Sequence, residues 1–365
     1  MSRYQYDKVL IAVTLFLVFF GIMMVFSASF VVSYQENGTE YYIFQRQVSF
    51  AVLGLLLLAM TMVLDYHVLK SSVYLILGVS LLLLVLVLIP GIGKEINGAR
   101  RWLGFMGLNF QPSELAKLAL VIYLAYSLTK KDDKIKSLKV GYLPHLVVMV
   151  IMAYLIWKQP DLGAAVTIGV IACIMLFMAG TRLSYLLVTV LGAGLVLYYK
   201  IFGEGYNSNR ITAYLNPWED QFGSGYHIVQ SYLALGSGGL TGVGLGQGIQ
   251  KLYYLPYAYS DFIFAVVGEE LGFIGAVLVI GAYALLAVRG FRAARRAPDL
   301  FGTYLAAGIT CLITVGAILN IGVVTGLFPT KGMTLPFISH GGSSLVINML
   351  AAGILINVSG QGVET

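Results

Sequence analysis

The chain has 365 residues, of which 58% are hydrophobic and only 11% are charged. Soluble domains carry about 25% charged residues, so this composition excludes a water-soluble globule. A net charge of +6 is then expected to reflect membrane topology, not binding to nucleic acid. The two cysteines lie inside apolar runs and the four histidines are scattered, which gives no sign of a disulfide framework or a metal site.

Long apolar runs predict membrane-spanning helices. The run Leu75–Ile89 is typical of such a helix, and it lacks the alternation of a barrel strand. In chain order the runs predict ten transmembrane helices, at about residues 8–29, 44–64, 71–90, 113–129, 142–157, 162–180, 183–201, 263–288, 301–327 and 341–358. We therefore expect an all-α polytopic membrane protein that forms a single domain over residues 1–365.

The basic residues predict the orientation of these helices. If the N-terminus is cytoplasmic, the two densest basic clusters, residues 130–139 and 289–296, also fall on the cytoplasmic side, as the positive-inside rule requires. Both termini are then cytoplasmic. The segment from about 202 to 262 becomes a large outer loop between helices seven and eight, and its many aromatic residues favour ordered structure at the membrane surface.

Two opposite charges open the fourth expected helix, in the segment QPSELAKLAL. Pro112 and Ser113 are typical of a helix start. Glu114 and Lys117 are three residues apart and share one face of the helix. This spacing favours a structural ion pair over a catalytic role.

The large outer loop offers a cation and a glycine-rich segment. Arg210 carries a guanidinium, which suits bidentate binding of phosphate or carboxylate. The segment GSGGLTGVGLGQG (236–248) lacks the G-K-[ST] of a P-loop, and no βαβ unit accompanies it. Its glycines are expected to permit tight turns and close backbone approach, while a weaker alternative is that their N–H groups face a phosphate.

Three carboxylates lie where this loop enters helix eight, in LPYAYSDFIFAVVGEELG. Asp261 has two interpretations: a helix start at which Ser260 or Asp261 is the N-cap, or a general base whose proton affinity is raised by desolvation. At about 100° per residue, Glu269 lies roughly 80° around the helix from Asp261, and Glu270 lies on the opposite face. Only Glu269 is therefore expected to face the same cavity as Asp261.

Lys331 is the only charge in the last outer loop, PTKGMTLPFISHGGSS. Pro329, Gly332 and Pro336 shape this loop. The lysine is placed either to meet an anion or to extend toward lipid headgroups, and the residues favour neither alternative.

Several long motifs, in the same order along nearly the whole chain, resemble the SEDS family (shape, elongation, division and sporulation). They are NGARRWLGF…FQPSELAKLA, KQPDLGAAV, RITAYLNPWED, SDFIFAVVGEELGFIG and NIGVVTGLFPTKGMTLPFISHGGSSL. GVGLGQGIQKLYYLP and PTKGMTLPFISHGGSS are more similar to the FtsW/SpoVE branch than to the RodA branch. The resemblance implies ten transmembrane helices and a peptidoglycan glycosyltransferase in the bacterial cytoplasmic membrane. Such enzymes polymerise lipid II on the outer face, with a class B penicillin-binding protein as transpeptidase partner.

The resemblance also implies site residues. The family's essential aspartate falls on Asp261, its loop lysine on Lys331, its loop arginine on Arg210, and its helix-four pair on Glu114 and Lys117. A sugar on a lipid pyrophosphate already has a stabilised leaving group, so one base and a few cations suffice. Asp261 is expected to be that base, and Arg210 and Lys331 are expected to bind substrate.

The chain departs from the family pattern at three positions near the site. Tyr257 stands where the branch usually has an acid, Tyr259 where a histidine is common, and His340 where a tyrosine is common. The first change removes a second carboxylate from beside Asp261. No metal ligands are assigned, and whether a divalent cation (Mg²⁺ or Mn²⁺) takes part stays open.

An alternative function is a lipid II flippase or a non-catalytic scaffold for the penicillin-binding protein. Arg46, Glu114, Lys117 and Asp161 would then line a polar path through the bundle. The concentration of polar residues on the outer side favours the enzyme. Membrane lipids are the other expected partners, and nucleic acid is not one.

Overall fold

The structure is a computed structural model that describes residues 5–96, 98–105, 108–203 and 214–362. Helices occupy every range expected to span the membrane. They are α1 (Lys8–Asn37), α2 (Tyr42–Val63), α3 (His67–Leu86), α4 (Pro112–Lys130), α5 (Leu143–Trp157), α6 (Leu162–Met178), α7 (Leu183–Gly203), α10 (Ile263–Arg296), α11 (Leu300–Val324) and α12 (Gly342–Gly360). The helix α9 (Tyr226–Ser237) lies within the large loop.

Within these described ranges, seven helices are long and apolar enough to cross a membrane: α1, α2, α3, α5 with its preceding turn (Leu138–Trp157), α10, α11 and α12. The apolar helices α6 and α7 are shorter by the same measure. The chain is therefore a multi-pass helical membrane protein, as its hydrophobic runs predicted.

A small sheet was not expected. Between α3 and α4 the chain forms β1 (Gly93–Ile96), β2 (Ala99–Phe105) and β3 (Leu108–Phe110), an antiparallel sheet in the order β1-β2-β3. Gly93 pairs with Leu103 and Leu103 with Phe110. The all-α fold class describes the bundle, and this small sheet is an addition that the sequence did not predict, because such short strands give no extended hydrophobic alternation.

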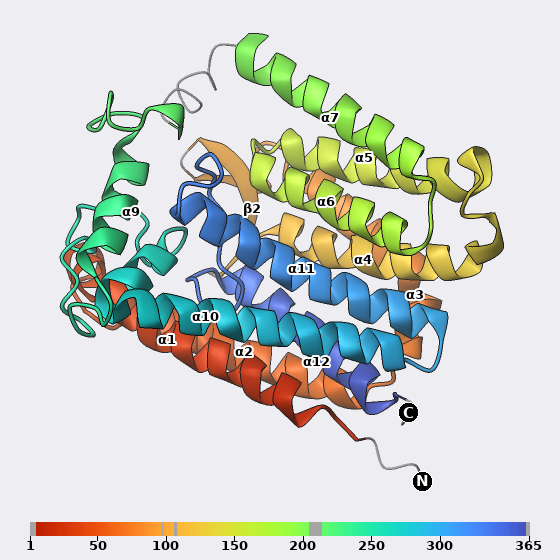
Figure 1. The fold of residues 1–365 in the computed structure, drawn as a ribbon, viewed down its shortest axis with the longest axis horizontal. Helices are drawn as coiled ribbons and strands as arrows, with labels where there is room; N and C mark the ends of the chain where they lie inside the picture. Colours follow the sequence, from red (N-terminus) through yellow and green to blue (C-terminus); the bar gives the residue numbers. More distant parts are fainter. Residues whose placement is uncertain (1–4, 97, 106–107, 204–213, 363–365) are drawn as a thin grey trace.

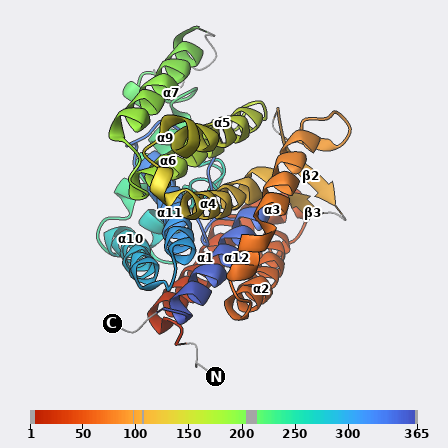
Figure 2. The ribbon, with the colours of Figure 1, turned by 90° about the vertical axis from the view of Figure 1, so that its right-hand side faces the viewer.

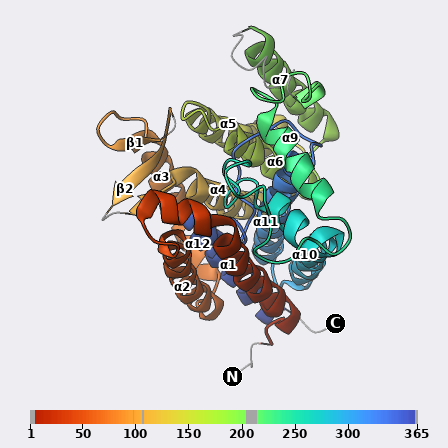
Figure 3. The same cartoon turned by 90° about the vertical axis from the view of Figure 1, so that its left-hand side faces the viewer.

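The helices pack side by side in a bundle (Figure 1). Figures 2 and 3 show α4, α11 and α12 near its middle and α7 at its edge. Most of α11 and α12 is buried, whereas α7 exposes apolar side chains such as Leu187, Val188 and Leu191. An exposed apolar helix face is what lipid contact requires.

Polar contacts join the chain ends at one end of the bundle. The Asp7 carboxylate caps α1 by accepting from Val9 N and Leu10 N, and it lies 2.7 Å from Arg289 Nη2. The Asp7 backbone N–H donates to Ser359 Oγ at 3.2 Å. The first described residues and the end of α12 therefore lie together, at the opposite end from α9 (Figure 1).

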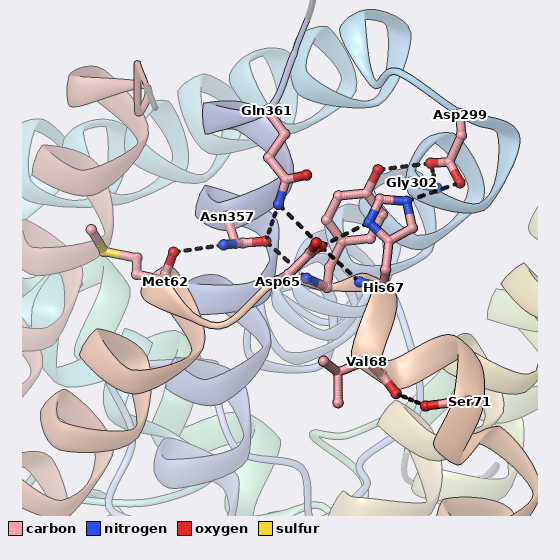
Figure 4. Close-up of polar contacts among 10 residues, drawn as sticks. Met62, Asp65, His67, Val68, Ser71, Asp299, Gly302, Asn357 and Gln361 are labelled. Atoms are coloured by element: carbon pink, nitrogen blue, oxygen red, sulfur yellow. Dashed lines mark hydrogen bonds and ion pairs between the residues drawn. The ribbon is translucent and has the colours of Figure 1, made fainter. Parts of the chain in front are cut away.

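A second polar cluster at this end joins two connections to the end of α12 (Figure 4). Tyr66 Oη, between α2 and α3, donates to Asp299 Oδ1 at 2.7 Å, just before α11. His67 Nδ1 lies 2.7 Å from Asp65 Oδ1. Asn357 Nδ2, near the end of α12, donates to the Met62 carbonyl at 2.7 Å. These bonds fix the spacing of α2, α3, α11 and α12 at this end of the bundle.

Candidate functional site

The glycine-rich segment and the residues directly after it bind the two carboxylates of α10. Ile249 N and Gln250 N donate to Glu269 Oε1 at 2.7 Å and 3.1 Å, and Gly246 N donates to Glu270 Oε2 at 3.1 Å. The expectation that Glu269 faces the cavity of Asp261 was therefore wrong. In a desolvated region, backbone N–H groups need acceptors, and the two glutamates of α10 supply them.

Lys251, which follows three residues after the glycine-rich segment, was not singled out by the sequence. It is 2% exposed, and its Nζ lies 2.5 Å from Glu270 Oε1. Ser27 of α1 donates to Glu270 Oε2 at 2.6 Å and accepts from Lys251 Nζ at 3.0 Å. The ion pair between Lys251 and Glu270 thus holds the large loop on α1 and α10. Both charges can be buried because they are paired with each other.

Asp261 lies in the turn before α10 and is partly buried. The N-cap interpretation was wrong. The N-cap residue of α10 is Phe262, and no side chain accepts a hydrogen bond from the first N–H groups of this helix. Asn320 Nδ2 holds the backbone in place by donating to the Asp261 carbonyl at 2.9 Å and to the Met333 carbonyl at 2.6 Å. Among the described residues, none forms a hydrogen bond or ion pair with the Asp261 carboxylate.

The electrostatics of Asp261 suit a base that works near neutral pH. Burial raises the pKa of Asp261 to about 7, while the positive charge of Arg101 lowers the pKa and the negative charge of Asp161 raises it. A general base is most effective when its pKa lies near the working pH.

The loop between α11 and α12 passes beside this carboxylate. A Cβ built on Gly332 would lie 3.1 Å from Asp261 Oδ2, so the loop backbone lines the carboxylate directly. Lys331, one residue earlier, is partly buried, and burial lowers the pKa of its ammonium. In the part of the chain that the structure describes, no carboxylate pairs with Lys331. The structure thus brings Lys331 and Asp261 to one region.

The turn between α5 and α6 forms a further wall. The Asp161 carboxylate caps α6 by accepting from Ala164 N at 3.0 Å, and it accepts from Gln111 Nε2 at 3.2 Å. A Cβ on Gly163 would lie 2.8 Å from Met333 Cγ, so this turn packs on the loop that lines Asp261.

Glu114 and Lys117 lie near the start of α4. Lys117 Nζ is 2.8 Å from Glu114 Oε1, and the two side chains are 14% and 8% exposed respectively. Glu114 Oε2 is buried and has no hydrogen-bond partner within the described ranges. The two residues therefore form an ion pair with each other.

The remaining sequence candidates are Arg210, Tyr257, Tyr259 and His340. Arg210 lies outside the described residues. The Tyr257 ring stacks on His227 at 6.4 Å between centroids, and His340 N donates to the Tyr259 carbonyl at 2.9 Å. Over residues 5–362, excluding the gaps given above, no three His, Cys, Asp or Glu side chains cluster to hold a metal ion. Asp261 has no neighbouring carboxylate at position 257 to complete a metal site.

Comparisons with known proteins place these features in a family. The FtsW/RodA/SpoVE profile, described as cell cycle protein, matches residues 7–363. The chain is 48% identical to the probable peptidoglycan glycosyltransferase FtsW of Trichlorobacter lovleyi, over 97% of this chain and 93% of the relative. It is 43% identical to the stage V sporulation protein E of Bacillus subtilis, over 97% and 96%.

Two solved structures are similar over the same extent. A chain of a peptidoglycan synthase complex that coordinates polymerization and crosslinking superimposes with a TM-score of 0.79 at 30% identity, over 97% of each chain. The rod shape determining protein RodA of Thermus thermophilus superimposes with a TM-score of 0.72 at 30% identity, over 97% of this chain and 96% of that one.

Proposed function

The chain belongs to the FtsW/RodA/SpoVE family of cell cycle proteins, and from this premise we propose that it is a peptidoglycan glycosyltransferase. Its substrate is lipid II, which it polymerises into glycan strands on the outer face of the bacterial cytoplasmic membrane. The observation that carries the proposal is Asp261: a partly buried carboxylate, unpaired among the described residues, with a pKa of about 7.

The proposed reaction needs one base and a stabilised leaving group. Asp261 takes the proton of the acceptor hydroxyl as the hydroxyl oxygen bonds to the donor's anomeric carbon. The bond from that carbon to the pyrophosphate oxygen breaks, and undecaprenyl pyrophosphate leaves with the electron pair. Lys331 and Arg210 balance the negative charge of this group. Glu114 and Lys117 support α4 beneath the site as a structural pair.

Topology and partners follow the same proposal. The helices α1–α7 and α10–α12 make ten membrane crossings in one domain, with residues 202–262 as a large outer loop. Both termini are cytoplasmic, which agrees with the hydrogen bond between Asp7, before α1, and Ser359, near the end of α12, at one end of the bundle. A class B penicillin-binding protein is the transpeptidase partner, and similarity to a chain of a peptidoglycan synthase complex supports this.

The test uses purified wild-type protein and Asp261→Asn with labelled lipid II in detergent, without an ion gradient. We expect the wild type to form polymer and the variant to lose about 10²–10⁴-fold in rate, the usual contribution of a general base. Asp133→Asn, on an exposed residue at the cytoplasmic end, is the matched control. Polymerisation by Asp261→Asn above about a tenth of the wild-type rate would exclude Asp261 as the general base. If the wild type forms no polymer in detergent but moves lipid II across the membrane of vesicles in a separate assay, a flippase is favoured.

A further inference from the structure

Adjacent arginines on β2 have different surroundings. Arg100 pairs with Glu95 across the hairpin at 3.0 Å, and both side chains are well exposed. Arg101 points the other way, as alternate strand residues do. Its Nε donates to the Gln159 carbonyl at 3.1 Å, and its Nη2 donates to the Pro160 carbonyl.

The Arg101 guanidinium is therefore held in place but not neutralised. Both of its bonds go to neutral carbonyl groups, although a guanidinium has five N–H donors. In the described parts of the chain it pairs with no carboxylate. Asp161, which follows Pro160, uses its carboxylate on Ala164 N, Gln111 Nε2 and Ser113 Oγ.

The turn that holds Arg101 is the one that packs against the site. Gly163 meets Met333, and Gly332 lies directly against the Asp261 carboxylate. The positive charge of Arg101 also lowers the pKa of Asp261. A partly buried cation with free donors is thus held on the turn that packs against the loop lining the proposed base, and Lys331 adds a second unpaired cation on that loop.

We propose that Arg101 binds the diphosphate of the lipid-linked substrate beside Asp261. This inference rests on the proposed function. A planar guanidinium matches phosphate oxygens in a bidentate way, and its anchoring on two carbonyls lowers the cost of ordering it. When the bond between the anomeric carbon and the diphosphate oxygen breaks, the electron pair remains on that oxygen. Arg101 stabilises this charge, while the acceptor proton goes to Asp261.

Binding is measured apart from turnover. In the Asp261→Asn background, wild-type Arg101 is compared with Arg101→Gln, Arg101→Lys and the control Arg100→Gln. The probes are undecaprenyl diphosphate and undecaprenyl monophosphate in detergent. We expect the Arg101 protein to prefer the diphosphate, Arg101→Gln to lose at least about tenfold of that preference, and Arg101→Lys to keep part of it. Arg100→Gln is expected to bind as its parent does. Equal binding of both lipids by the parent would indicate general headgroup contact and would overturn the proposal.

Turnover gives the second measurement. With Asp261 intact, Arg101→Gln is expected to lower kcat about 10²–10³-fold, as for loss of one transition-state donor, and to change KM less. The midpoint of its pH–rate profile is expected to move upward, because the charge that lowers the pKa of Asp261 is gone. Values within twofold of the Arg100→Gln control, in both binding and rate, would overturn the inference. If the wild type makes no polymer, the proposed function fails, and the binding comparison still tests Arg101.

Folding does not obscure the result. Arg101→Lys keeps the charge and can still reach one carbonyl, so it is the variant to assay if Arg101→Gln does not fold. Suppose that Arg101→Lys folds and keeps both the wild-type preference for the diphosphate and the wild-type kcat. Bidentate binding by the guanidinium is then not needed, and the proposal is overturned.

Discussion

Lys251 Nζ lies 2.5 Å from Glu270 Oε1, and the two side chains are 1% and 0% exposed. Lys251 Nζ also lies 4.9 Å from the centre of the Phe30 ring. Ser27 and Phe30 belong to α1, Lys251 to the large loop and Glu270 to α10. This one pair therefore joins the N-terminal helix to the segment that leads into Asp261.

Removing one partner of this pair should destabilise the protein. Lys251→Met or Glu270→Gln alone is expected to cost about 3–5 kcal/mol, because the remaining charged or polar group stays buried without its partner. The double variant should recover part of the loss. Thermal unfolding in detergent measures this, with the exposed Lys136→Met as the control. Single variants as stable as that control would contradict the structural role.

Gly272 should resist substitution, unlike a second glycine on the same helix. It interrupts α10 with φ 66° and ψ −162°, and a Cβ there would overlap Gly242 N in the glycine-rich segment. Gly272→Ala should destabilise by at least about 1–3 kcal/mol, the cost of a strained backbone residue. Gly281→Ala is the control, because a Cβ at Gly281 meets no atom within 4 Å. Equal unfolding temperatures for the two variants would refute this.

The Glu114–Lys117 pair should matter for folding more than for chemistry. Glu114→Gln or Lys117→Met leaves one buried group unpaired and should lower the unfolding temperature and the folded yield. Exchanging the two residues should restore part of both. Rate per folded molecule is measured alongside. Wild-type stability in both single variants would show that the pair is not structural.

Lys331 should contribute to turnover more than to lipid binding. Lys331→Met is expected to lower the polymerisation rate, because a cation near the leaving group acts as charge develops. Lys331→Arg should restore only part of the polymerisation rate, since a planar guanidinium does not have the geometry of a compact ammonium. If Lys331 only reaches lipid headgroups, Lys331→Met should lower the polymerisation rate little and Lys331→Arg should not lower it. Rates normalised to folded protein separate these outcomes.

The raised pKa of Asp261 predicts two pH dependences. As a base it works when deprotonated, so kcat/KM should rise with pH through about 7 and then level off. The folded protein binds this proton more tightly than the unfolded chain, where the pKa is near 3.8. Ionisation of Asp261 therefore lowers stability as pH rises from about 4 to about 7. Asp261→Asn should lack this decline, and parallel stability profiles for the two proteins would contradict the assignment.

The hydrophobic runs alone determined where the long helices lie, because a membrane-spanning helix satisfies its own backbone within one segment. Family resemblance, carried by local motifs, singled out Asp261 and Lys331. The strands β1–β3 were not predicted because they are short and show no regular alternation of apolar and polar residues, and their pairing depends on the hairpin as a whole.

Only the tertiary structure decided what each charge meets. Ser27, Lys251 and Glu270 come from three separate segments, and no local spacing relates the first to the others. Helix geometry did not predict the partners of Glu269, because residues 249 and 250, directly after the glycine-rich segment, fold back over α10 to donate their N–H groups. Arg100 and Arg101 are adjacent and chemically identical, yet one faces Glu95 and the other the turn beside Asp261. A charged group's role depends on its burial and its partners, and these are set by packing between segments far apart in the chain.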